Sequence, residues 1–356
     1  MAPLDGSPSI SNELGIRPLM ERVLSRGEIL GAKDSHPAKF TPSSGPAVFR
    51  GVGHESFPDN LLMEVCSVTT QWDHRTAIVN GINIHYVTQG EGDPVILLHG
   101  WPEFWYGWRC QIPVLADRYQ VIAPDLRGFG YSDKPLTGYD TRTSASDIYE
   151  LMRALGHEQT LIVAHDIGAR VAFRFALDHE DAVRKLVLLD STPPTELLGP
   201  QYPAVIRERW HVYFHQQFDL PEKLLEGKEE IYLWHILRDW SVNKHPVSEE
   251  ELAQYVKAYS QPGAWRGGFN YYRAMADEDP PQWQADADRQ LATPFLFLFG
   301  MRRVKTAEAM GTGPLENVWK RIFPQARAKN LGDYGHFIQW EAPDLVNKEL
   351  LAFLAE

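Results

Sequence analysis

The chain has 356 residues, 44% of them hydrophobic and 23% charged, a mix typical of a globular protein rather than of a disordered, collagen-like or coiled-coil chain. Thirty-five basic and 47 acidic residues leave a net charge of −12, which repels a phosphate backbone and argues against a nucleic-acid partner. No run of about 18 apolar residues occurs, so the sequence predicts no membrane span, and its N-terminus lacks a signal-peptide pattern.

Residues 1–71 form a polar leader that is rich in Pro, Gly and Ser. Within it, apolar residues recur at helical spacing between positions 14 and 30. This pattern predicts a short helix and irregular chain that together pack on the main body. The leader is expected to be an N-terminal extension, and its role cannot be read from the sequence.

A regular pattern of strands and helices begins near residue 72. Residues 77–79 and 82–86 read as two strands joined by Asn80-Gly81, the signature of a type I′ hairpin turn. Further apolar runs are expected to be strands, and amphipathic stretches between them to be helices. The predicted strands are 94–98, 119–124, 160–164, 185–189, 294–299 and 326–331, and the predicted helices include 144–155, 168–178 and 343–354. Such alternation predicts an α/β fold, with a mostly parallel sheet covered on both faces.

Residues 191–290 break this alternation, because they are rich in Trp, Tyr, His and charged residues at helical spacing. We interpret them as a helical cap inserted between two parts of the α/β core, at 72–190 and 291–356. A separate C-terminal domain is the alternative. Insertion is favoured because the last strands and the final helix resume the first pattern.

Asp166 stands at a predicted turn from strand to helix, in the sequence Ala164-His-Asp-Ile-Gly168. Small residues at its two ends permit the sharp turn that presents a nucleophile above the sheet. The nucleophile would then be a carboxylate, kept ionised by the helix N-terminus. Taken by itself, Asp166 could equally be a simple helix cap.

Two other residues at predicted strand ends complete a candidate constellation. His336, on a Gly- and aromatic-rich loop before the last helix, suits a general base, and Asp190 could orient its imidazole. The alternatives are an ordinary loop His and a turn-capping Asp. After the first parallel strand, the N–H of Trp101 could join that of Ile167 as an oxyanion hole, unless this segment is a plain strand-ending turn. The order nucleophile, acid, base at successive strand ends is hard to obtain by chance.

At these residues the chain resembles the α/β-hydrolase superfamily, in particular its branch with an Asp nucleophile, which contains epoxide hydrolases and haloalkanoate dehalogenases. The resemblance covers about residues 72–355 and rests on three segments in order. These are His99-Gly-Trp-Pro-Glu103, Asp125-Leu-Arg-Gly-Phe-Gly-Tyr-Ser132 and His165-Asp-Ile-Gly168. It implies an eight-stranded core with a helical cap over the nucleophile.

The position of the acid places the chain within that branch. Many members carry the acid after the strand that corresponds here to 294–299, but this sequence continues with Gly300-Met-Arg-Arg and no carboxylate. Asp190 instead matches a subgroup with the acid on the earlier strand. This subgroup contains fluoroacetate dehalogenases and epoxide hydrolases that open the ring with a His/Tyr pair.

The resemblance also separates these two activities. Fluoroacetate dehalogenases hold the substrate carboxylate with two Arg, but here Ile167 takes the first position and only Arg170 remains. Their halide cradle includes a His-Trp pair, of which His211 is present and Val212 replaces the Trp. His211 and Tyr272 match the donor types of the epoxide hydrolases, although either could be an ordinary helix or core residue. An apolar Ile167 favours an uncharged, apolar substrate.

The resemblance therefore implies a cofactor-free and metal-free hydrolase in which Asp166 forms an alkyl ester, most readily with an epoxide. The expected acid, base and donors are Asp190, His336, His211 and Tyr272, and the expected substrate contacts are His99, Trp101, Trp105, Arg170, Trp210 and Phe337. The alternatives are a 2-haloacid dehalogenase and a non-catalytic relative that binds a ligand or partner. With only Cys66 and Cys110, no disulfide framework is expected and a cytoplasmic location is the default. A homodimer is left open.

Overall fold

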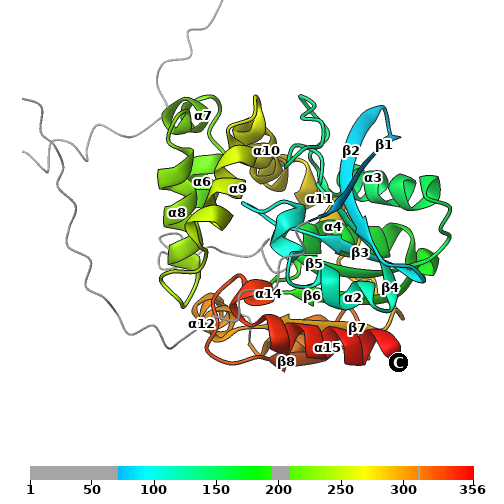
Figure 1. The fold of residues 1–356 in the computed structure, drawn as a ribbon. Coiled ribbons are helices and arrows are strands. Elements are labelled where there is room, and N and C mark those ends of the chain that lie inside the picture. Colours follow the sequence, from blue (N-terminus) through cyan, green and yellow to red (C-terminus); the bar gives the residue numbers. More distant parts are fainter. Residues whose placement is uncertain (1–70, 195–208, 312) are drawn as a thin grey trace, which may run out of the picture. The chain divides into compact units, whose positions relative to one another are not determined.

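The computed structural model describes residues 71–194, 209–311 and 313–356, so the helix expected near residues 14–30 lies outside the described residues (Figure 1). Its centre is an eight-stranded sheet with the order β1-β2-β4-β3-β5-β6-β7-β8. Strand β2 pairs antiparallel with β1 and β4, and the pairs from β4 to β8 are parallel. The strands are β1 Asp73–Val79, β2 Ile82–Gln89, β3 Asp93–Leu98, β4 Tyr119–Pro124, β5 Thr160–His165, β6 Val183–Leu189, β7 Phe295–Phe299 and β8 Arg327–Asn330.

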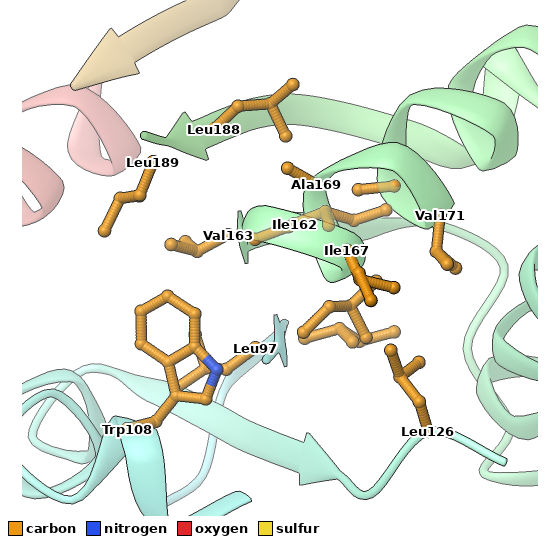
Figure 2. Packing of buried hydrophobic residues seen from close by; sticks show 14 of the residues in the cluster. Leu97, Trp108, Leu126, Ile162, Val163, Ile167, Ala169, Val171, Leu188 and Leu189 are labelled. Carbon is orange, nitrogen blue, oxygen red and sulfur yellow. The ribbon is translucent and has the colours of Figure 1, made fainter. Parts of the chain in front are cut away.

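The expected hairpin and parallel strands are confirmed, because each follows from local sequence. Asn80 and Gly81 both have positive φ, at 49° and 78°, as a type I′ turn requires, and Val79 pairs with Ile82 across it. The central strands are apolar throughout, since helices cover both of their faces. Figure 2 shows Leu97 of β3, Ile162 and Val163 of β5 and Leu188 and Leu189 of β6, all fully buried.

The chain reverses its direction across the sheet after β4, and this reversal decides which helices cover which face. Helix α2 connects β3 to β4 on one side, whereas α3 and α4 lead from β4 through β5 to β6 on the other. Because crossovers between parallel strands are right-handed, α2 lies on the opposite face from α3 and α4. Open α/β sheets form ligand crevices where such a reversal occurs, here at the carboxyl ends of β3 and β5.

The helices of the core follow the expected pattern, and the last of them, α15, contacts α2. Helix α4 begins at Asp166, two residues earlier than the sequence predicted, so Asp166 is itself the first helical residue. The helices of the core are η1 Trp105–Trp108, α2 Ile112–Ala116, α3 Thr141–Ala154, α4 Asp166–Asp178, η2 Glu180–Ala182, α12 Met301–Met310, α13 Leu315–Lys320, α14 Ile338–Glu341 and α15 Pro343–Ala355.

Between β6 and β7, the residues that the structure describes form helices and no strand, and we call Trp210–Ala285 the helical insertion. Its first helices gather on the left in Figure 1. Ser248 and Glu251 form a capping box at the start of α9, and Glu251 also accepts a 2.6 Å bond from Arg109 of the core. The helices are α6 Trp210–His215, α7 Leu220–Leu225, α8 Glu229–Trp240, α9 Glu249–Tyr259, α10 Ala264–Asp277 and α11 Asp279–Ala285.

Within the described ranges, none of the helices has the length and apolar character that a bilayer crossing requires.

Candidate active site

The carboxyl ends of four strands bring the candidate catalytic residues together. Trp101 follows β3, Asp166 follows β5 and Asp190 follows β6. His336 stands on the loop between β8 and α14. These positions are far apart in sequence but adjacent in the sheet, because β3, β5 and β6 are neighbouring parallel strands.

The backbone around Asp166 has the sharp turn that its flanking residues predicted. Asp166 adopts a φ of 50°, in the left-handed region that non-glycine residues rarely occupy. A Cβ on Gly168 would lie 2.3 Å from the carbonyl oxygen of His99, and a Cβ on Gly100 would lie 2.4 Å from the Cβ of Asp166. Both positions therefore need glycine for α4 and the loop after β3 to approach each other this closely.

The Asp166 carboxylate is held from two sides. The Trp101 N–H donates to Oδ1 at 3.0 Å, and Nε2 of His336 lies 3.4 Å from Oδ2. Burial raises the pKa of this carboxyl, but the hydrogen bond and charge of His336, with smaller contributions from His165 and the Trp101 amide, hold it well below its usual range. This favours the ionised carboxylate. Among the described residues, the main-chain N–H that the Asp166 side chain accepts from is that of Trp101 and not one of α4, so the side chain does not cap this helix.

His336 lies between two carboxylates. Its Nδ1 donates to Oδ2 of Asp190 at 2.5 Å, which leaves Nε2 directed at Asp166. Burial lowers the pKa of His336, but its hydrogen bonds to Asp166 and Asp190 and their charges outweigh burial and raise it to about 9. The imidazole is consequently protonated at neutral pH while both carboxylates are charged.

Asp190 is fixed by main-chain and side-chain contacts. It has a φ of 42°, and its N–H donates to the carbonyl oxygen of Leu298 at 2.9 Å. Arg303 donates to its Oδ2 at 2.9 Å and also to its main-chain oxygen. Burial raises the pKa of Asp190, but Arg303 and His336 lower it well below its usual range. Its side chain accepts a hydrogen bond from the His336 imidazole, the contact through which Asp190 would orient that ring.

Two neutral hydrogen-bond donors of the helical insertion border the same cavity as Asp166. His211 comes from α6 and Tyr272 from α10, and their rings pack edge to face with centroids 6.0 Å apart. Burial, assisted by the charge of Arg209, lowers the pKa of His211 to about 3, so this imidazole is neutral. Burial and the nearby Asp166 charge raise the pKa of Tyr272 well above its usual value, so its hydroxyl stays protonated.

The cavity itself lies between the core and the helical insertion. The core contributes the two aspartates, His336 and Ile167, and the insertion contributes Val212, Trp240 and Met275 beside the donors. Arg170, Arg209, Arg302 and Arg303 also line it.

Five of the six expected substrate contacts do not line this cavity, and only Arg170 does. Trp105 packs on Trp72 and His74 near β1, and Trp210 faces outward from α6 with 41% of its surface exposed. Phe337 is fully buried behind His336, where it stacks on Trp340. His99 is fully buried as well, with Nε2 accepting from the N–H of Leu126 and Nδ1 donating to Gly100.

The two expected oxyanion donors, Trp101 and Ile167, differ in the contacts that they make. Trp101 donates its N–H to Asp166, while its fully buried indole packs on the His211 and Tyr272 rings and supports both donors. Ile167 borders the cavity, but among the described residues no hydrogen bond joins its N–H to Asp166.

Sequence reasoning missed a buried network that holds the site from behind. Glu103 accepts from Nδ1 of His165 at 2.7 Å and from the Trp340 indole at 3.0 Å, and Nε2 of His165 donates to the His336 carbonyl at 2.9 Å. Burial raises the pKa of Glu103, but His165 and Trp340 more than offset this and lower it. The network links the loop after β3 to the His336 loop. Its signal was Glu103, a charged residue at the end of the first motif.

Arg209 and Arg303 were missed too. Arg303 lies just after β7, where the family resemblance led us to look for an acid, so a basic residue at that position was the available signal. Arg209 precedes α6 in a segment without a motif. As for metals, the described residues contain no group of three His, Cys, Asp or Glu side chains able to hold an ion.

The fold and the site define a hydrolase-type α/β protein with a carboxylate at the turn after its central strand. A family model described as the alpha/beta hydrolase fold matches residues 93–231. The chain is 36% identical to a soluble epoxide hydrolase of Corynebacterium sp. strain C12, over 81% of this chain and 99% of that one. It is 32% identical to a fluoroacetate dehalogenase of Burkholderia sp., over 80% and 94% of the two chains.

The solved ligand-free structure of the epoxide hydrolase CorEH matches with a TM-score of 0.74 and 36% identity, over 80% of this chain and 99% of that one. The chain belongs to the α/β-hydrolase family, as its sequence motifs indicated.

Proposed function

We propose that this protein is an epoxide hydrolase that works through an ester of Asp166, without a cofactor. The observation that carries the proposal is the position of Asp166. Its carboxylate lies between a main-chain donor and His336, and two neutral donors border the same cavity. Relatives named as epoxide hydrolases support it. We also propose that residues 191–290 act as the cap over this cavity.

In the first step, Oδ2 of Asp166 attacks one epoxide carbon and the carbon–oxygen bond of the ring breaks. Oδ1 stays with the Trp101 N–H and becomes the carbonyl oxygen of the ester. Tyr272, which is protonated at neutral pH, gives its proton to the leaving oxygen, and neutral His211 donates a hydrogen bond. The product of this step is a hydroxyalkyl ester and a Tyr272 phenolate.

The second step depends on the loss of the Asp166 charge in the first step. Once Asp166 is an ester, His336 loses the charge that raised its pKa, and its proton is released to restore the Tyr272 hydroxyl through solvent. The neutral imidazole, held by Asp190, then takes a proton from a water that attacks the ester carbonyl. Trp101, joined by Ile167, stabilises the oxyanion, and the diol leaves with Asp166 restored.

A 2-haloacid dehalogenase is the second candidate, because Arg170 in the cavity could hold a carboxylate. The relative of this chain that is named as a fluoroacetate dehalogenase supports that alternative. Against it, Ile167 occupies the place where a second Arg would assist. A charge-assisted hydrogen bond contributes about 1.5–3 kcal/mol, so its loss weakens such a clamp considerably.

The test is a single turnover of styrene oxide in ¹⁸O-water. We expect ¹⁸O in the peptide that contains Asp166 and none in the newly formed hydroxyl of the diol, because water attacks the ester and not the epoxide. His336→Gln should accumulate the ester on Asp166, detected by intact mass and peptide mapping. His235→Gln, at an exposed position on α8, is the matched control and should form no adduct.

Label in the diol instead of Asp166 would refute the ester mechanism. Without adduct or diol, the same assay is repeated with fluoroacetate and chloroacetate, where halide release would establish the dehalogenase. No reaction with any of these substrates would favour the non-catalytic, ligand-binding relative.

A further inference from the structure

The candidate active site contains more positive charge than the proposed reaction uses. Four arginines line the cavity: Arg170, Arg209, Arg302 and Arg303. The apolar Ile167 led us to expect an uncharged substrate, and this cluster points the other way.

Contacts within the protein account for two of the guanidinium groups. Arg303 pairs with Asp190 at 2.9 Å, and the positive charge of His336 balances Asp166 at 3.4 Å. Arg302 donates to the carbonyl oxygen of Asp239 and lies over the Trp240 ring.

Arg170 and Arg209 differ from these two. Neither forms an ion pair or a hydrogen bond with any residue that the structure describes, although both border the cavity. Arg170 lies one helical turn after Asp166 on α4, and therefore on the same face of that helix. Arg209 directly precedes α6, two residues before His211. Arg170 thus borders the cavity from the core, and Arg209 borders it from the residue directly before the helical insertion.

The surroundings make this arrangement unfavourable without a counter-ion. Burial, together with the charges of Arg170 and Arg303, lowers the pKa of Arg209 to about 10. Burial lowers the pKa of Arg170 as well. The charge of Asp279 raises the pKa of Arg170 from a distance. Asp279 does not pair with this arginine, because its Oδ1 accepts hydrogen bonds from the amide and hydroxyl of Thr141. Buried charges are normally paired, so an anionic group held between the two arginines would be stabilised by both.

A second cavity continues from this point. Arg170, Arg209, Val212 and Met275 border both cavities, and Trp283 and Tyr213 are among the other residues that line the second. The cavity volume is about 110 Å³ beside Asp166 and about 240 Å³ in the second cavity. A substrate therefore has room on both sides of the arginine pair.

We propose that the substrate carries a carboxylate that binds between Arg170 and Arg209 while its epoxide reaches Asp166. This inference rests on the proposed function and names the class of epoxide: an epoxy acid rather than a neutral epoxide. A planar guanidinium forms paired hydrogen bonds to a carboxylate, and two of them match its two oxygens.

The test compares 4-carboxystyrene oxide with styrene oxide, which differ only in the carboxylate. We expect kcat/KM to be about 10- to 100-fold higher for the acid, from the typical strength of charge-assisted hydrogen bonds. Arg209→Gln and Arg170→Gln should each reduce this preference at least about tenfold, and Arg209→Lys should restore part of it. Arg238→Gln, an exposed position on α8, is the matched control and should keep the preference.

A binding measurement separates this inference from the proposed function. Calorimetry with 3-phenylpropanoate and 3-phenylpropanamide requires no epoxide chemistry. We expect the acid to bind the wild type and to bind Arg209→Gln at least about tenfold more weakly, with the amide insensitive to the variant.

Two results would overturn one conclusion and leave the other standing. Equal kcat/KM for the two epoxides, together with no binding of the acid, would overturn the carboxylate site while the epoxide hydrolase stands. Binding of the acid that depends on Arg209, with neither epoxide opened, would support the carboxylate site and overturn the proposed reaction.

Discussion

Replacing Asp166 with Asn removes the charge that raises the pKa of His336, just as formation of the ester would. The variant therefore serves as a stable substitute for the esterified enzyme. In the wild type the imidazole lies 3.4 Å from Oδ2 of Asp166 and has a pKa of about 9. We expect this pKa to fall in Asp166→Asn, because only Asp190 then stabilises the imidazolium.

The separation sets the size of the change. At 3.4 Å and an effective dielectric constant of about 20, two unit charges interact with about 5 kcal/mol, an upper bound for a pair that solvent still reaches. Because about 1.36 kcal/mol corresponds to one pH unit, a decrease of about 1 to 3 pH units is expected. A decrease of about 2 pH units or more from about 9 would make the neutral form dominate at physiological pH, as a general base requires.

The assay is an NMR titration of protein labelled with ¹³C at its histidine rings. His336→Gln identifies the relevant signal by its absence, since the chain contains 13 histidines. An unchanged titration midpoint near 9 in Asp166→Asn would refute the coupling. So would a wild-type midpoint near the ordinary histidine value.

Three further predictions concern stability and activity. Gly100→Ala should reduce ester formation at least about 100-fold, because its Cβ would lie 2.4 Å from the Cβ of Asp166. The control Gly156→Ala places no atom within 4 Å of the new Cβ, so it should keep activity and reduce only stability, because Gly156 has a positive φ. The pKa of His336 is raised to about 9 in the folded state, so its contribution to stability is complete below about pH 6.5 and is lost as the pH rises through 9. Urea unfolding should show a decrease of about 3 kcal/mol in the free energy of unfolding over this range, which His336→Gln should lack. Equal decreases in both proteins would contradict the assignment. Tyr272→Phe should slow ring opening about 100-fold in stopped-flow experiments, and an unchanged rate would remove it from the donor role.

The strands, their mostly parallel arrangement and the turn at Asp166 were predictable because they depend on local signals. Apolar runs fully buried in a parallel sheet, and small residues around Asp166, are visible in the sequence itself. The helix expected from Gly168 begins at Asp166, because a left-handed φ of 50° there lets the helix start directly after the strand.

The direction of aromatic side chains was not predictable in the same way. Trp101 and Trp105 are four residues apart after the same strand, yet the first supports the donors and the second packs near β1. Which side an aromatic ring takes depends on partners distant in sequence. The same holds for Arg209 and Arg303, whose charges acquire meaning only when α6 and β7 are brought beside Asp166 and Asp190.

The main-chain bond from the His336 N–H to the Trp240 carbonyl, 2.8 Å long, is a direct tie between the catalytic loop and the helical insertion. A Cβ on Gly335 would lie 2.3 Å from that same carbonyl, so the two segments are packed too closely for a side chain at this position. For protein engineering this divides the insertion into two regions. Residues of α6 and α10 other than the donors His211 and Tyr272 can be exchanged to change selectivity. The end of α8 should be kept unchanged in any chimaera that carries a foreign insertion on this core.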